Sequence, residues 1–190
     1  MHDVATIAGV LCNAPDPLPA RFSFRGNGAG FRDLEASLAQ VSVAAKRAID
    51  VGGNLPEAEW IDAMTEADVA LVTMPSGAEG LVMPSKTYSA MIAGQAILAI
   101  CPDESDLADI VKKHGCGWVV RPGDVAGVAT VIREIGSNPE RLLEKRHAAY
   151  RAGHQFYDQP ALAVMWENLI RDMAKAAENA EKLKTETVKW

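Results

Sequence analysis

Two short apolar segments constrain the fold of this chain more than any other feature. The segments DVALVTM (68–74) and QAILAI (95–100) have the length of strands, but they lack an alternation of polar and apolar residues. Strands of this kind are covered on both faces, as in parallel sheets that carry helices on either side. Segments with helical spacing separate the strand-like runs, so the sequence predicts an α/β fold with a doubly wound, mostly parallel, Rossmann-like sheet.

The rest of the chain continues this alternation. Further strands are expected at ARFSFR (20–25), RAIDV (47–51) and GWVV (117–120). The segment NAPDPLPA (13–20) consists of helix and strand breakers and is predicted to be a loop. We expect one domain over residues 1–170 and a helical tail over 171–190. Helices are expected at 4–11 after a cap at Asp3, after GNGAG (26–30), and at 55–67, 84–93, 104–114, 124–135, 138–151 and 159–184.

Composition argues against several classes of function. The net charge is −6, and outside the tail no cluster of basic residues is longer than Lys112-Lys113, so a nucleic-acid surface is not expected. Three cysteines without C-x-x-C spacing fit reduced thiols better than disulfides or zinc. The start of the chain lacks a basic signal-peptide region, and no apolar run approaches the roughly 20 residues that span a bilayer. These features predict a cytoplasmic location.

GNGAGF (26–31) has the position of a dinucleotide-binding fingerprint, because it follows an expected strand and opens a helix. Asp50 lies near the end of the next strand, where a ribose partner would stand. However, Phe31 replaces the third glycine, which normally allows the helix and strand to pack closely. A plain turn that uses glycine backbone freedom is therefore favoured. An NAD- or FAD-binding domain stays open as an alternative.

A second candidate is the Pro84-Ser85-Lys86 run before an expected helix. Proline suits the first turn of a helix, and a serine hydroxyl can accept a hydrogen bond from a free amide there. The exposed N–H groups, the positive end of the helix dipole and the Lys86 ammonium would together favour a phosphate or diphosphate. The alternative is an ordinary capped helix with Lys86 in solvent.

Three segments carry a resemblance to a known family. They are FRGNGAGFRDLEASL, GGNLPEAEWIDAMTEADVALVTM and the longer run that begins AEGLVMPSKTYSAMIAGQAILAI, within which P-S-K-x-Y-x-x-M-x-x-G is the most specific piece. Over about residues 3 to 170, the sequence resembles the C-terminal, donor-binding half of GT-B glycosyltransferases. More narrowly, it resembles the retaining group 1 family of bacterial polysaccharide biosynthesis.

The resemblance implies a nucleotide-sugar donor, UDP- or GDP-linked, with no further cofactor and no metal. The implied base and ribose positions are Asn54, Leu55 and Ser89; the diphosphate positions are Pro84, Ser85 and Lys86; the donor-sugar loop holds Glu79, Gly80, Leu81 and Val82. A pair of glutamates found in many relatives falls here on Leu81 and Ser89. Ser89 is too short to hold both ribose hydroxyls as a carboxylate does. The catalytic residue is left unknown.

Relative to that family, the chain starts at a helix, without the preceding strand, a basic glycine-rich loop and the acceptor-binding half. We expect a partner chain or missing half to supply them, with the enzyme peripheral at the inner membrane through that half. The chain alone is expected to be inactive and to self-associate through unpaired strand edges. A non-catalytic binding or assembly module is the other open alternative. Trp60, Trp118 and Trp166 are expected in the core, and the histidines show no metal-ligand spacing.

Overall fold

The computed structural model describes residues 3–13, 19–39 and 41–187, so most of the expected loop at 13–20 lies outside the described residues. Each of the five expected strands is confirmed at nearly its expected place. They are β1 (Phe22–Arg25), β2 (Ile49–Gly52), β3 (Val69–Thr73), β4 (Ala96–Ile100) and β5 (Gly117–Val120).

The expected helices are also present, and their ends have local causes. Asp3 caps the first helix by accepting a hydrogen bond from the Thr6 amide, and Ser105 caps the sixth by accepting one from the Ala108 amide. The sixth helix ends at Gly115, whose φ of 61° is left-handed. The helices are α1 (Val4–Cys12), α2 (Ala29–Leu38), α3 (Val43–Lys46), α4 (Glu57–Glu66), α5 (Lys86–Ile92), α6 (Asp106–His114), α7 (Val125–Ser137), α8 (Pro139–Ala152), the π-helix η1 (Gly153–Tyr157) and α9 (Gln159–Thr187).

All strand pairs are parallel, as predicted, but the described strands form two sheets. One contains β1 and β2, and the other has the order β3-β4-β5. The division into two sheets also affects how deeply the strands are buried. Every residue of β4 is buried, whereas Val69, Ala70 and Leu71 of β3 are only half-buried. β3 thus has a strand neighbour on one side and an edge without a strand neighbour on the other.

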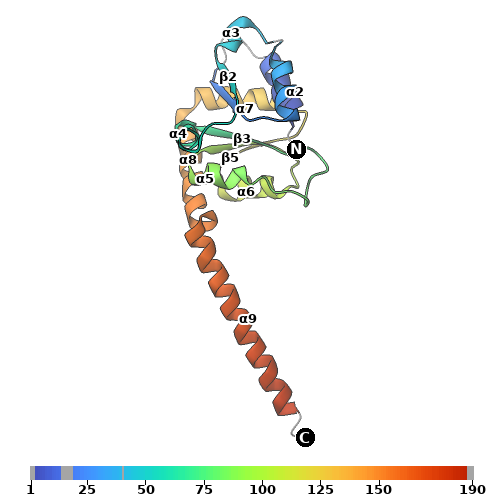
Figure 1. Cartoon of the computed structure of the whole chain (residues 1–190), viewed down its shortest axis with the longest axis vertical. Coiled ribbons are helices and arrows are strands. Elements are labelled where there is room, and N and C mark those ends of the chain that lie inside the picture. Colours follow the sequence, from blue (N-terminus) through green and yellow to red (C-terminus); the bar gives the residue numbers. More distant parts are fainter. Residues whose placement is uncertain (1–2, 14–18, 40, 188–190) are drawn as a thin grey trace.

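β4 divides the interior into two apolar layers. Ala96, Leu98 and Ile100 face one layer, together with apolar residues of α1, α2 and α7. Ile97 and Ala99 face the other, with residues of α5, α6 and α8. Figure 1 shows α2 and α7 on one side of the three-stranded sheet and α5 and α6 on the opposite side. Helices therefore cover both faces, which confirms the doubly wound α/β prediction.

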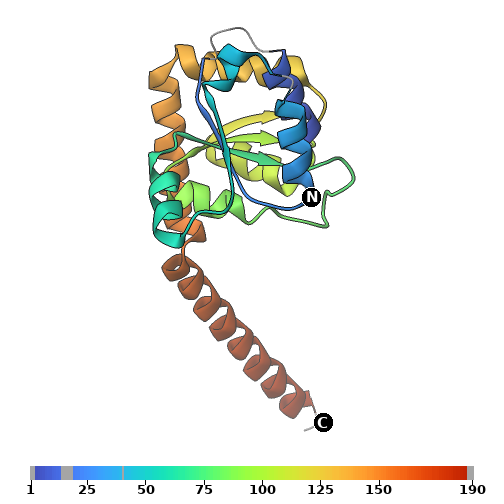
Figure 2. The same ribbon diagram turned by 45° about the horizontal axis from the view of Figure 1, so that its top comes forward.

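The three tryptophans expected in the core behave differently. Trp118 is buried, and its indole N–H donates a 3.0 Å hydrogen bond to the Glu134 carboxylate. The expectation is wrong for Trp60 and Trp166, which are 41% and 63% exposed. Trp60 lies on α4, which buries none of its residues, and Trp166 lies on α9, which leaves the domain (Figures 1 and 2).

Candidate functional site

The carboxyl ends of the three-stranded sheet bring several loops together. The Met74 amide donates to the Ile100 carbonyl at 2.8 Å, and the Cys101 amide donates to the Val120 carbonyl at 2.9 Å. These bonds extend the strand pairing into the loops at 74–85, 101–105 and 121–124. Ligands of open α/β sheets bind at this edge, so we call these three loops, with the start of α1, the rim.

Two hydrogen bonds hold the start of α1 against the end of β3 and the loop after β5. The Asp3 amide donates to Thr73 Oγ1 at 3.1 Å, at the end of β3. The Gly123 amide donates to Thr6 Oγ1 at 2.8 Å, in the loop after β5. Thr6 Oγ1 also donates to the Asp3 carboxylate at 2.5 Å. A short polar chain thus links α1 to the ends of two strands.

The Pro84–Lys86 element begins a helix, but not in the expected manner. α5 starts at Lys86 and is seven residues long. Ser85 makes no side-chain capping bond, so the expected cap is wrong. Its backbone is already helical (φ −59°, ψ −25°), whereas a capping side chain needs a non-helical residue to reach the next amides. Lys86 is exposed, and its side chain forms no ion pair or hydrogen bond within the described part of the chain.

The expected donor-sugar loop lies directly before this element. Glu79 Oε2 accepts a 2.8 Å hydrogen bond from the Gly77 amide, which closes a tight turn. Gly80 has a left-handed φ of 69°. Leu81 and Val82 are 81% and 53% exposed. The loop thus offers a constrained carboxylate and an open apolar surface.

The expected base and ribose positions are less closely tied to this loop. Asn54 is exposed and Leu55 half-buried, and both follow β2 of the two-stranded sheet. Ser89 is exposed on α5, one turn beyond Lys86. No hydrogen bond given for the described residues joins Asn54 or Ser89 to the diphosphate positions. The structure therefore groups residues 79–89 in one segment and leaves residues 54–55 on a separate loop.

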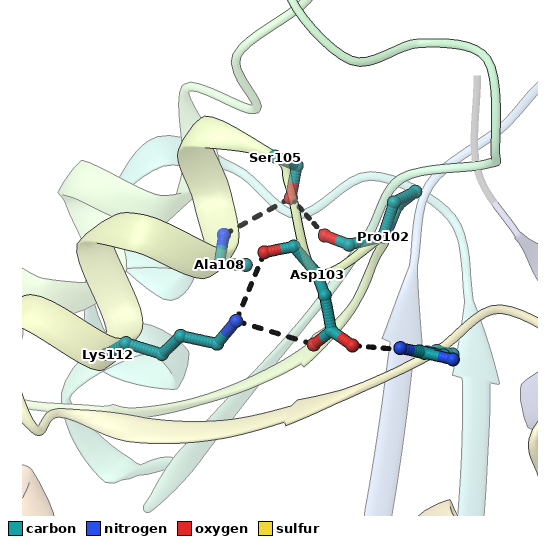
Figure 3. A network of polar contacts seen from close by, with 6 residues as sticks. Pro102, Asp103, Ser105, Ala108 and Lys112 are labelled. Atoms are coloured by element: carbon teal, nitrogen blue, oxygen red, sulfur yellow. Dashed lines mark hydrogen bonds and ion pairs between the residues drawn. The ribbon is translucent and has the colours of Figure 1, made fainter.

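An ion-pair network at the rim was missed by the sequence reasoning. The Asp103 carboxylate accepts 2.8 Å and 3.4 Å hydrogen bonds from Arg121 Nε and Lys112 Nζ, and the Lys112 ammonium also donates to the Asp103 carbonyl at 3.1 Å (Figure 3). The hydrogen bond from Arg121 is the main cause that lowers the pKa of Asp103, and the hydrogen bond from Lys112 is the second. In turn, Asp103 raises the pKa of Arg121. The signal was available: opposite charges stand just beyond the ends of two adjacent parallel strands.

Two side chains beneath the rim, Cys101 and Thr87, are buried. Burial raises the pKa of the Cys101 thiol, although the Ser105 hydrogen bond acts in the opposite direction. A thiol kept protonated in this way is a poor nucleophile. Thr87 is fully buried, and its hydroxyl has no hydrogen-bond partner in the described part of the chain. No group of three or more His, Cys, Asp or Glu side chains in that part could hold a metal ion.

The residues of the dinucleotide alternative are otherwise engaged. Asp50 forms an ion pair with Arg25 on the neighbouring strand.

Two surface hollows lie away from the rim. One of about 460 Å³ lies between α2 and β2, and one of about 250 Å³ lies between the end of α5 and α8. Neither hollow is lined by a residue expected to bind the donor.

Comparison with known proteins gives a consistent picture. No family model matches the sequence. Over 145 residues it is 32% identical to the "Probable glycosyltransferase WbjE" of Pseudomonas aeruginosa. The aligned region covers 72% of this chain and 36% of that protein. The prediction made from the sequence is confirmed: the chain resembles one part of the GT-B group 1 glycosyltransferases.

Three solved structures share the fold, each at 16% sequence identity. Sucrose-phosphate synthase from Thermosynechococcus elongatus matches with a TM-score of 0.71 over 92% of this chain and 43% of its own. A TarM of S. aureus, solved in complex with UDP among other ligands, matches with a TM-score of 0.66 over 88% and 32%. WaaG, a glycosyltransferase involved in lipopolysaccharide biosynthesis, matches with a TM-score of 0.62 over 81% and 40%.

The chain therefore spans about a third of WbjE and less than half of each of these three structures. Within its described residues, no helix is both long enough and apolar enough to cross a membrane.

Proposed function

We propose that this chain is the nucleotide-sugar-binding domain of a retaining glycosyltransferase that acts in polysaccharide or glycoconjugate biosynthesis. The observation that carries the proposal is the 32% identity to the glycosyltransferase WbjE over 145 residues. The site supports it, because an exposed lysine at the start of α5 directly follows the glycine-containing rim loop at the carboxyl ends of parallel strands. The TarM structure that contains UDP has the same fold.

In this proposal the rim holds the leaving group. The Lys86 ammonium and the amides at the start of α5 would offset the negative charge that grows on the diphosphate as the glycosidic bond breaks. Glu79, Leu81 and Val82 would lie against the donor sugar, and the loop with Asn54 and Leu55 against the base. The acceptor, and the residues that activate it, would come from a partner domain that faces the open rim.

Calorimetry with the isolated chain tests the donor site. A nucleoside diphosphate, or its sugar, should bind more tightly than the free nucleoside, with UDP and GDP compared to identify the base. Equal affinities for diphosphate and nucleoside would remove the diphosphate role from residues 84–86. A dinucleotide that bound more tightly than any nucleotide sugar would instead favour a role for GNGAGF.

A further inference from the structure

The short helix α5 carries two of the residues expected to meet the donor. Lys86 stands at its start and Ser89 follows one turn later, and both are exposed. A helix of seven residues closes few hydrogen bonds of its own, and helices this short are barely stable alone. Ser85, directly before it, adds no side-chain capping bond. The segments that pack against α5 therefore decide how Lys86 and Ser89 are presented.

The sheet and the π-helix η1 both pack against α5. Thr87, Ala90 and Met91 are buried on the side of α5 that meets the sheet. At the other end of the helix, a Cβ added to Gly153 of η1 would lie 2.8 Å from the Ile92 amide nitrogen. The backbones of η1 and α5 are therefore in direct contact. π-Helical turns are rare and are often found at functional sites, so we asked what this one holds in place.

Tyr157, the last residue of η1, joins α5 to α6. Its ring centroid lies 4.9 Å from that of Tyr88 on α5, a separation that aromatic pairs favour, and the two planes are tilted by 42°. Its hydroxyl lies 2.9 Å from His114 Nε2 at the end of α6. Both tyrosines are half-buried. Tyr88 directly precedes Ser89 and follows Lys86 by two residues, so the position of its ring is coupled to both expected donor positions.

We propose that Tyr157 is a positioning residue for the donor site: by holding the Tyr88 ring, it fixes the orientation of α5 and so of Lys86. The inference rests on the function proposed above. Tyr157 is not among the residues expected to touch the donor, and it acts through Tyr88. The contact with His114 restrains Tyr157 in turn, because its ring and its hydroxyl are held by two different helices. A binding site loses affinity when the residues that support it let it loosen.

NMR relaxation of the backbone amides tests the effect on α5 without any ligand. Tyr157→Leu removes both the ring and the hydroxyl, and it should increase the mobility of the α5 amides while the β4 amides stay rigid. Tyr157→Phe keeps the ring against Tyr88 and should behave as the parent chain does. Phe156→Leu is the matched control, because Phe156 also belongs to η1 but its ring contacts within the described chain are with His114 and Tyr157.

Calorimetry tests the effect on the donor site. Tyr157→Leu should weaken the binding of a nucleoside diphosphate by about fivefold. It should weaken the free nucleoside less, because the base is expected at residues 54–55 on a separate loop. Tyr157→Phe should keep the affinities of the parent chain. Tyr88→Leu removes the same contact from the α5 side and should reproduce the effects of Tyr157→Leu, and the double variant should bind no worse than either single one.

Three outcomes would overturn the proposal. Unchanged mobility of α5 in Tyr157→Leu would show that the ring contact does not hold the helix. Loosening of α5 by Phe156→Leu to the same degree would assign the effect to η1 as a whole. An equal loss of affinity for diphosphate and nucleoside would show that Tyr157 only supports the fold. A parent chain that binds neither ligand would instead contradict the proposed function, and the NMR comparison would still decide whether Tyr157 holds α5.

Discussion

Lys86 is the one charged side chain among the residues expected to hold the diphosphate, and it is exposed without a partner in the described structure. Replacing it with alanine should weaken the binding of a nucleoside diphosphate by about 1–2 kcal/mol, as for a partly exposed charge-assisted contact. Stability should hardly change, since a cation at a helix start is slightly unfavourable. Calorimetry measures the affinity and thermal unfolding the stability, with Lys175→Ala on α9 as control. Lost stability with unchanged affinity would contradict the donor role.

His114 predicts a pH dependence of folding. Its Nε2 lies 2.9 Å from the Tyr157 hydroxyl. Burial is the main cause that lowers the pKa of the His114 imidazole below 6.5, and the positive charge of Lys113 is the second cause. As the pH falls through 6.5, the unfolded chain takes up the proton first. The native state therefore loses stability below pH 6.5, and the loss levels off once the pH is below the folded pKa.

Thermal unfolding above and below pH 6.5 measures this loss. His114→Gln should make the acid-induced decrease in melting temperature smaller. The same substitution at His147, an exposed residue of α8, is the control and should leave the decrease as it is. An identical decrease in the parent chain and His114→Gln would show that the imidazole does not contribute.

For single residues, the sequence correctly predicted those roles that depend on residues close by in the chain. Asp3 caps α1 as expected, because capping involves amides only three residues away. Ser85 does not cap α5, because its backbone conformation is set by the loop before it. Trp60 and Trp166 were placed in the core on the basis of apolar neighbours in sequence, yet burial depends on which helix face meets the sheet. The Asp103–Arg121 pair joins two loops and could not be assigned from either loop alone.

Among the elements, the crossing of η1 and α5 depends on one small residue. A Cβ added at Gly153 would lie 2.8 Å from the Ile92 amide nitrogen and 2.8 Å from the Met91 carbonyl carbon. Backbone atoms cannot move away cheaply, so Gly153→Ala should lower the free energy of unfolding by about 1–3 kcal/mol. Chemical denaturation measures this change.

The matched control is Gly30→Ala, also at a helical glycine. There the nearest atom, in the Val4 side chain, is 3.9 Å away, so the added methyl group makes an ordinary van der Waals contact without a clash. It should leave stability unchanged or raise it by up to about 1 kcal/mol, since alanine favours helix. Equal effects of the two substitutions would contradict a close approach at Gly153.

The elements and their parallel, doubly wound arrangement were predicted well, while two short helices were not. The apolar runs of β3 and β4 identified strands, because a covered strand needs apolar side chains on both faces. The short helix α3 and the π-helix η1 were not expected, since neither has a distinctive local pattern. The division into two sheets depends on pairing between distant segments. It agrees with the unpaired strand edges expected from the resemblance, and β3 is half-buried beside such an edge.

For the whole molecule, we expect the chain alone to show no measurable glycosyl transfer, even at saturating nucleotide sugar. Transfer needs donor and acceptor held in reacting geometry, which is worth about 7–11 kcal/mol of the barrier. The chain spans only about a third of its relative WbjE, and its rim is open. A sensitive assay for released nucleoside diphosphate measures this. Acceptor-dependent turnover by the purified chain would contradict the need for a second domain.

The position of β4 also sets the order in which the native state opens. Among the described strands, β4 is paired on both sides and covered on both faces, whereas β1 and β2 pair only with each other. The amides of β4 should therefore exchange with deuterium only through global unfolding, and those of β1 and β2 through a smaller, separate opening. Mass spectrometry of peptides from the labelled chain would resolve the two classes. Residues 54–55 follow β2, so the loop expected to meet the base is attached to the part of the protein that unfolds first.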